Sequence, residues 1–370
     1  MIPVYLYQGV YIYTMLLLSV VTCLYVRNSG YGSLSAESGF SMGGWGALAL
    51  CLVTAVWLGM RPVNGFYFGD TSNYAHTYEL MQMSLSGAED HSSEWVWESL
   101  MSYCSGMMDV SGFFTIVSLG YFGCTFWACR RLMPNGVWVA VLFNLIAFSF
   151  YSYGTNGIRN GLACSMMLVV LSYARGNSAS KVMAGAVAFL MINIHRSTML
   201  PLLMMLVSMT CVKSFRNAYV FWLLSIAISL VAGNTVAGFF AGLGFDERLS
   251  YITDEQDQGL FSGSGFRWDF LVYSMMPIVF GYYIIIRRGI RDGLYEMLLN
   301  TYTLTNAFWV MVIRANYSNR FAYLSWFMYP VVLAYPLLRM NIWEEGQGSR
   351  LSQIMLAHAA FTWLMLIIFT

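Results

Sequence analysis

Long apolar runs of about 20 residues recur from one end of the chain to the other, bounded by Arg, Asn and Gly. A run of this length forms a helix that crosses a bilayer, because a helix satisfies its own backbone hydrogen bonds in hydrocarbon. The composition agrees, since 58% of the 370 residues are hydrophobic and 10% are charged, whereas soluble domains carry about a quarter charged residues. The sequence therefore predicts an all-α, polytopic integral membrane protein.

About twelve transmembrane helices are expected, in a single transmembrane domain that covers residues 1–370. Their approximate bounds are 4–26, 44–60, 110–129, 136–153, 158–174, 182–195, 197–212, 218–238, 269–286, 294–313, 321–338 and 351–369. The two longest connections are 61–109 and 239–268, and short helices are expected in the first.

The positive charges predict the orientation of these helices. Alternate connections divide the 19 Lys and Arg residues into sets of 12 and 7. Cytoplasmic connections carry the excess of positive charge, so the larger set faces the cytoplasm and both termini face outward. The 61–109 and 239–268 loops then lie in the periplasm and hold most of the acids. The outer set is Arg61, Arg159, Arg196, Arg248, Arg267, Arg314 and Arg320.

Every positive residue on the outer side is an arginine, and both lysines fall inside. A charge at the bilayer centre costs about 2.5–3.5 kcal/mol, and less where it faces water or a partner. The guanidinium fork binds phosphate or carboxylate through two nitrogens, which lysine cannot do. We therefore expect these arginines to line an outward cavity for an anion. Contact with lipid headgroups and pairing with the loop acids are the alternatives for each arginine.

The segment NGIRNG, from Asn156 to Gly161, predicts a turn followed by a helix start. Arg159 would then lie in the first helical turn, where free N–H groups and the helix dipole favour an anion. Gly157 and Gly161 are spaced for close helix packing, which is the purely structural interpretation of these glycines.

The stretch MINIHRSTMLPLL places His195 and Arg196 at the outer end of the sixth predicted span. We expect both to face the cavity that receives Arg159, although a histidine in an apolar run is also commonly a hydrogen-bonded core residue. In the loop GDTSNY, Asp70 fits either a helix cap or a general base at the mouth of the cavity.

The seven cysteines lie mostly inside apolar runs and form no CxxC pair, so neither a disulfide framework nor a metal site is predicted. The net charge is +1 and no basic tract is present, which gives no indication of a nucleic-acid partner.

Four short stretches resemble the EpsG-like, Wzy-type polymerases of bacterial surface polysaccharides. They are RPVNGFYFGDTSNY with Arg61, Asp70 and Tyr74, RNGLA from Arg159 to Ala163, IHRSTMLPLL with His195, and NRFAYLSWF with Arg320. The resemblance follows the order of the spans over most of the chain. Arg196, directly after the histidine, departs from the family pattern.

This resemblance implies glycosyl transfer between oligosaccharide repeat units carried on undecaprenyl diphosphate. The reaction would take place at the periplasmic face of the bacterial inner membrane, in the synthesis of O-antigen, capsule or exopolysaccharide. The resemblance further implies a fold distantly like GT-C glycosyltransferases, no metal and no cofactor. The expected partners are a lipid-linked donor and acceptor, membrane lipid, a chain-length regulator and a flippase.

On this basis Arg159 and Arg320 are expected to bind diphosphate, because fixed cations stabilise the charge that grows on the leaving group. The other expected substrate-binding residues are Arg61, Tyr74, Arg196, Arg267 and Arg314. Either His195 or Asp70 would accept the proton of the attacking hydroxyl, and His195 could instead donate a hydrogen bond to the diphosphate.

Two other functions also suit a cationic cavity in a membrane. A flippase for the same lipid-linked substrate would show related halves or broken helices, and no internal symmetry is apparent in the sequence. A membrane O-acyltransferase would use a histidine in an apolar run, but His195 lies on the side away from a cytoplasmic thioester.

Overall fold

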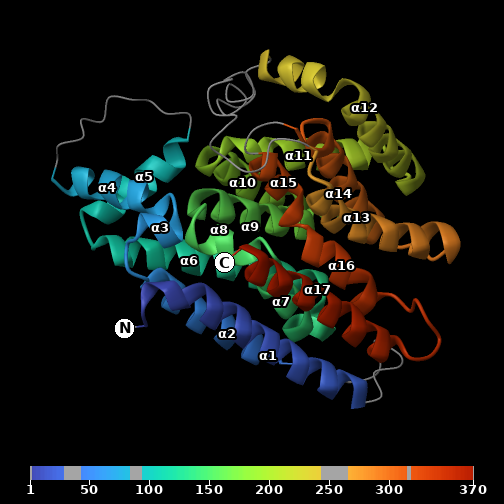
Figure 1. Cartoon of the computed structure of the whole chain (residues 1–370), viewed down its shortest axis with the longest axis horizontal. Helices are drawn as coiled ribbons and strands as arrows, with labels where there is room; N and C mark the ends of the chain where they lie inside the picture. Colours follow the sequence, from blue (N-terminus) through green and yellow to red (C-terminus); the bar gives the residue numbers. More distant parts are fainter. Residues whose placement is uncertain (1, 29–42, 84–93, 243–265, 315–317, 370) are drawn as a thin grey trace. The chain divides into compact units, whose positions relative to one another are not determined.

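The computed structural model describes residues 2–28, 43–83, 94–242, 266–314 and 318–369, and the description below refers to these residues. They form helices joined by short connections, with no strand among them (Figure 1). The chain divides into two compact units. The first comprises Met1–Arg196 and Ala334–Thr370, and the second comprises Ser197–Leu333. The single transmembrane domain expected over residues 1–370 stays a prediction.

Eleven named helices lie wholly in the first unit. They are α1 (Tyr7–Asn28), α2 (Gly44–Gly59), α3 (Gly65–Phe68), α4 (Thr71–Gln82), α5 (Trp95–Ser105), α6 (Val110–Leu132), α7 (Val137–Leu145), α8 (Phe150–Thr155), α9 (Ile158–Tyr173), α10 (Ser178–Ile194) and α17 (Gln347–Phe369). Helices α2, α6, α9 and α10 pack side by side in that order, and α5 lies against α10. Helix α1 packs against α17, so the first and last α-helices of the described chain are neighbours (Figure 1).

Capping side chains mark the start of two of these helices, α6 and α10. At the start of α6 the Asp109 carboxylate accepts a hydrogen bond of 2.8 Å from the Gly112 backbone N–H. Arg130 and Arg131 lie in the last turn of α6, where positive charge complements the helix dipole. Asn177 caps α10 in the same way, accepting from the Ser180 N–H at 3.0 Å. Polar side chains thus mark where α6 and α10 begin.

The second unit contains α11 (Met199–Thr210), α12 (Phe215–Gly242), α13 (Trp268–Tyr282), the π-helical turn η6 (Tyr283–Arg287), α14 (Gly293–Met311) and α15 (Ser318–Trp326). Helix α14 packs against both α11 and α12. Its buried Asn306 accepts a hydrogen bond from the Trp222 indole at 2.8 Å and donates one to Ser325 at 3.1 Å. The remaining helix, α16 (Tyr329–Arg339), begins in this unit, and its residues from Ala334 onward belong to the first.

Six helical segments of the described chain are long and apolar enough to cross a membrane. They are Val4–Arg27, Val110–Leu132, Phe215–Gly233, Trp268–Arg287, Asn319–Arg339 and Gln347–Ile367. Shorter apolar helices are Gly44–Gly59, Pro134–Leu145, Ile158–Tyr173 and Ser178–Ile194. The prediction of an all-helical membrane protein with several crossings is therefore confirmed.

Each predicted span coincides with helix, but two of them are divided. The span predicted at 136–153 is split between α7 and α8, and the span predicted at 321–338 between α15 and α16. A proline near the start of α16, Pro330, explains the second break, because proline favours the first turn of a helix and disfavours its interior. Most of the loop predicted at 239–268 lies outside the described residues.

The free thiols agree with the prediction from cysteine spacing. All seven cysteines are described, and none forms a disulfide.

Candidate functional site

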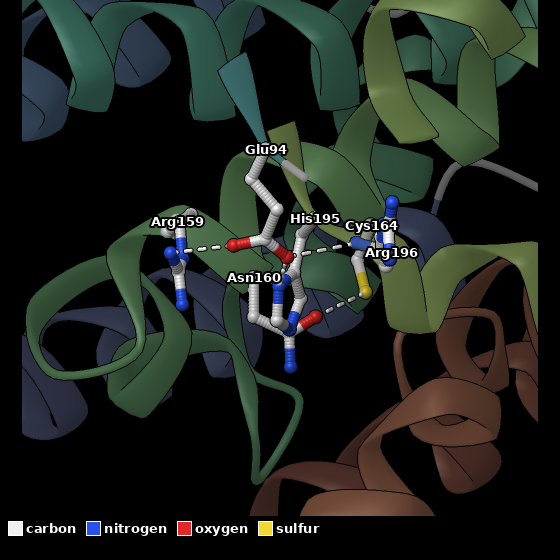
Figure 2. A network of polar contacts seen from close by, with 6 residues as sticks. All are labelled: Glu94, Arg159, Asn160, Cys164, His195 and Arg196. Carbon is white, nitrogen blue, oxygen red and sulfur yellow. Dashed lines mark hydrogen bonds and ion pairs between the residues drawn. The ribbon is translucent and has the colours of Figure 1, made fainter. Parts of the chain in front are cut away.

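A single carboxylate, that of Glu94, joins three cationic or hydrogen-donating groups (Figure 2). The Arg159 Nη1 lies 2.5 Å from Glu94 Oε2. The other oxygen, Oε1, accepts from His195 Nδ1 at 2.8 Å and from the Arg196 backbone N–H at 3.0 Å. Figure 2 shows Glu94 between Arg159 on one side and His195 with Arg196 on the other. We call these four residues the Glu94 cluster.

Three helix ends bring the cluster together. Glu94 directly precedes α5, and Arg159 is the second residue of α9, as the sequence predicted. Helix α10 ends at Ile194, and His195 follows in an extended conformation with φ −153° and ψ 110°. Helix α10 packs against both α5 and α9, so its end delivers His195 and the Arg196 N–H to the other two residues.

The members of the cluster differ in their access to solvent. The side chain of His195 is 4% exposed, that of Glu94 14% and that of Arg159 26%. The Nε of Arg159 is buried and has no hydrogen-bond partner among the described residues. Arg196 is exposed. The arginines therefore form the accessible part of the cluster, and His195 lies behind the carboxylate.

The charge state of Glu94 follows from its neighbours. Burial raises the pKa of the Glu94 carboxyl, but the hydrogen bond and charge of His195, the charge of Arg159 and the Arg196 N–H outweigh burial and lower it to about 2. The carboxylate is therefore ionised throughout the physiological range and is a poor proton acceptor.

The loop that carries Asp70 is fastened to the start of α9. The Asn156 side-chain oxygen, between α8 and α9, accepts a hydrogen bond of 2.8 Å from the Asp70 backbone N–H. Gly69 has φ +53° and ψ −121°, and a Cβ there would overlap the Asn156 amide. Only glycine fits this position. The exposed Asp70 side chain makes no capping hydrogen bond to α4, which it precedes, so the cap expected as an alternative is not formed.

Gly161 supports the same junction, because a Cβ there would lie 2.6 Å from the Tyr153 carbonyl oxygen of α8. This close approach is the structural role that the glycine spacing predicted. In α4, the Tyr74 ring is half-buried and packs edge-on against Trp97 with centroids 5.5 Å apart. Its proposed part in substrate binding stays a prediction.

Arg61 lies inside the protein. It is 1% exposed, and its guanidinium donates to the carbonyls of Leu58 at 2.6 Å and Thr155 at 2.8 Å. The rings of Phe68 and Phe114 lie 5.5 and 5.2 Å from its Cζ. Burial lowers the pKa of the Arg61 guanidinium to about 10, so it stays charged near neutral pH. This position joins the end of α2 to the end of α8 and gives no support to a substrate-binding role.

Three other predicted arginines belong to the second unit. Arg267 forms a two-nitrogen ion pair with Asp269, at 3.0 and 2.7 Å, and its Cζ lies 3.7 Å from the Phe270 ring centroid. Arg314 is exposed near Phe266. Arg320 is half-buried in the first turn of α15. The expectation that all the outer arginines share one cavity stays a prediction, and Arg248 lies outside the described residues.

Sequence reasoning did not single out Glu94. It was one of a dozen acids in the outer loops, and its partner His195 lies 101 residues away in the sequence. The one relevant expectation was the alternative that an outer arginine pairs with a loop acid. For Arg159 this pairing is observed, with the addition that the same acid also binds His195 and Arg196. Within the described chain, no three His, Cys, Asp or Glu side chains form a metal-binding group.

The fold and the cluster together define a polytopic helical membrane protein with a cationic site at the ends of α9 and α10. The family model of the EpsG family matches residues 47–368. The chain therefore belongs to the EpsG family, which confirms the resemblance predicted from the sequence. No curated protein and no solved structure matches the chain. Membership indicates a glycosyltransferase-like, polysaccharide-polymerase type of function.

Proposed function

We propose that this protein joins oligosaccharide repeat units carried on undecaprenyl diphosphate, at the periplasmic face of the bacterial inner membrane. The observation that carries the proposal, beside family membership, is the Glu94 cluster. It places the accessible guanidinium of Arg159 at the N-terminus of α9, where a diphosphate would find both a cation and the positive end of the helix dipole.

In the proposed reaction a hydroxyl of the acceptor unit attacks the anomeric carbon of the donor sugar. The bond between that carbon and the diphosphate oxygen breaks, and undecaprenyl diphosphate leaves with an additional negative charge. Arg159 stabilises this charge as it develops, because a preorganised cation in a partly dry site needs no rearrangement during the reaction. Arg320 keeps its predicted role as a diphosphate ligand, and the reaction is proposed to proceed without a metal.

The hydroxyl proton passes to a base, for which the sequence left two candidates. We assign this role to Asp70. Its carboxylate is exposed, and its backbone is tied to Asn156, at the junction that leads into Arg159. His195 is 3% exposed overall and its Nδ1 is engaged by Glu94, which makes it a less accessible acceptor. The pH dependence of an Asp70→Asn variant would report on this assignment.

The proposal is tested in cells by comparing alanine variants. Arg159→Ala and Arg320→Ala should abolish polymer and leave single repeat units on the lipid carrier, at a normal level of protein. Arg175→Ala is the matched control, because Arg175 is an exposed arginine just beyond the other end of α9. Polymer of normal length in both alanine variants would refute the assignment.

The count of about twelve crossings, the distant likeness to GT-C enzymes and the partnership with a flippase and a chain-length regulator stay predictions. A flippase is distinguished by its product, because it would move lipid-linked units across a vesicle membrane without lengthening them.

A further inference from the structure

The Glu94 cluster contains a feature that diphosphate binding alone does not require. A site for a polyanion is expected to keep its cations unpaired, yet Arg159 is paired with a carboxylate at 2.5 Å. That carboxylate weakens the attraction of the site for phosphate, because it cancels part of the local positive charge. A fixed acid at this position therefore needs a reason other than strength of binding.

The geometry supplies such a reason, since the two oxygens of Glu94 have different partners. Oε2 contacts Arg159 Nη1, and Oε1 accepts from His195 Nδ1 and the Arg196 N–H. His195 is held in the interior, and the Arg196 donor is backbone, so Oε1 is anchored by groups that move little. The anchored carboxylate fixes one nitrogen of the guanidinium. Because Nε is buried and Nη1 contacts Glu94, Nη2 is the nitrogen of the fork that can meet a substrate.

We infer that Glu94 is a positioning residue for the transfer reaction, which holds the Arg159 guanidinium at a set angle while His195 and the Arg196 amide anchor its carboxylate. His195 then acts through Glu94 and does not itself take the proton. This inference rests on the proposed function, because the orientation of Arg159 matters only if Arg159 meets the leaving diphosphate. The low pKa of Glu94 is consistent with this role, since a carboxylate that stays ionised maintains its ion pair with Arg159 at every physiological pH.

The inference predicts that binding and turnover respond in opposite ways to loss of the Glu94 charge. In Glu94→Gln the cluster becomes more positive, so diphosphate should bind as tightly as before or more tightly. The guanidinium loses its fixed angle, and misplacement of a catalytic group by about 1 Å can lower a rate by about a hundredfold. We therefore expect kcat to fall by about ten- to a hundredfold with no rise in KM.

The experiment uses full-length protein in lipid nanodiscs and measures the initial rate of joining two lipid-linked repeat units. Binding of undecaprenyl diphosphate alone is measured on the same samples by native mass spectrometry. Glu98→Gln is the matched control, because Glu98 lies one turn further along α5 and makes no ion pair in the described chain. A Glu94→Gln kcat within twofold of the control, or a higher KM at unchanged kcat, would overturn the inference.

Variants of His195 separate positioning from proton transfer and remain informative if Glu94→Gln does not fold. The side-chain amide of asparagine can place an N–H near the position of His195 Nδ1, whereas alanine cannot. His195→Asn should therefore retain at least fivefold more activity than His195→Ala. Equal loss in both variants, at equal folded protein, would contradict the anchoring role and return His195 to the role of base.

The outcomes also separate this inference from the function on which it rests. If the unaltered protein neither joins repeat units nor binds undecaprenyl diphosphate, the proposed function fails. If it does both, and Glu94→Gln matches Glu98→Gln, only the positioning role of Glu94 fails.

Discussion

Replacing Arg159 by lysine keeps the positive charge and removes the fork, so this change tests whether geometry or charge is needed. In the native protein Nη1 of the guanidinium contacts Glu94 at 2.5 Å and Nε is buried, so Nη2 is the nitrogen that can meet a substrate. A lysine side chain has a single nitrogen, that of its ammonium group. Because Glu94 is ionised and anchored, it would capture that ammonium and leave nothing directed at the diphosphate.

The magnitude follows from the contact that is lost. A hydrogen bond to a charged group contributes about 1.5–3 kcal/mol. Since about 1.4 kcal/mol corresponds to a factor of ten, Arg159→Lys should lower the rate of joining by about ten- to a hundredfold. Arg159→Ala should be worse, at about a hundred- to a thousandfold, because it removes the cation and leaves Glu94 facing the substrate.

The assay is the initial rate of dimer formation from one lipid-linked repeat unit, normalised to folded protein. Arg175→Lys serves as the control, because that exposed arginine lies just beyond the opposite end of α9. A wild-type rate in Arg159→Lys would refute the reasoning and would indicate that Arg159 only contacts lipid headgroups.

Two further substitutions test the residues that hold the loop of Asp70 and the ends of α2 and α8 in place. Gly69→Ala should lower activity and destabilise the loop by about 1–3 kcal/mol, because alanine disfavours this backbone conformation and its Cβ would clash with Asn156. Gly185→Ala is the control, because the space around a Cβ there is open, and it should leave the thermal unfolding temperature unchanged. Arg61→Met should lower the melting temperature in detergent, because the buried Thr155 carbonyl loses its hydrogen-bond donor at a cost of about 1–3 kcal/mol. Normal stability with loss of polymerisation would instead place Arg61 at the substrate site.

The membrane architecture could be predicted from the sequence because its signal is local. An apolar run of about 20 residues is visible without any knowledge of its neighbours. The position of Arg159 at a helix start was equally predictable, since the turn residues Asn156 and Gly157 directly precede it. The divided helices at α7–α8 and α15–α16 were missed because hydrophobicity continues across both breaks.

The site itself could be predicted only in part, because it depends on contacts between distant segments. Arg61 and Arg159 look alike in sequence, each at the end of a predicted span. Packing alone makes Arg61 buried between aromatic rings and leaves Arg159 accessible. Glu94 could not be chosen among the loop acids, since it reaches its partners only after α5 packs against α10.

In the proposed reaction this protein itself lengthens lipid-linked oligosaccharides. Purified full-length protein in vesicles, supplied with one undecaprenyl-diphosphate-linked repeat unit and a metal chelator, and without nucleotide sugar, tests it most directly on a gel. We expect a ladder of products that differ by one repeat unit and that disappears with Arg159→Ala. A single unchanged band with the unaltered protein, under conditions where it is folded, would contradict the account.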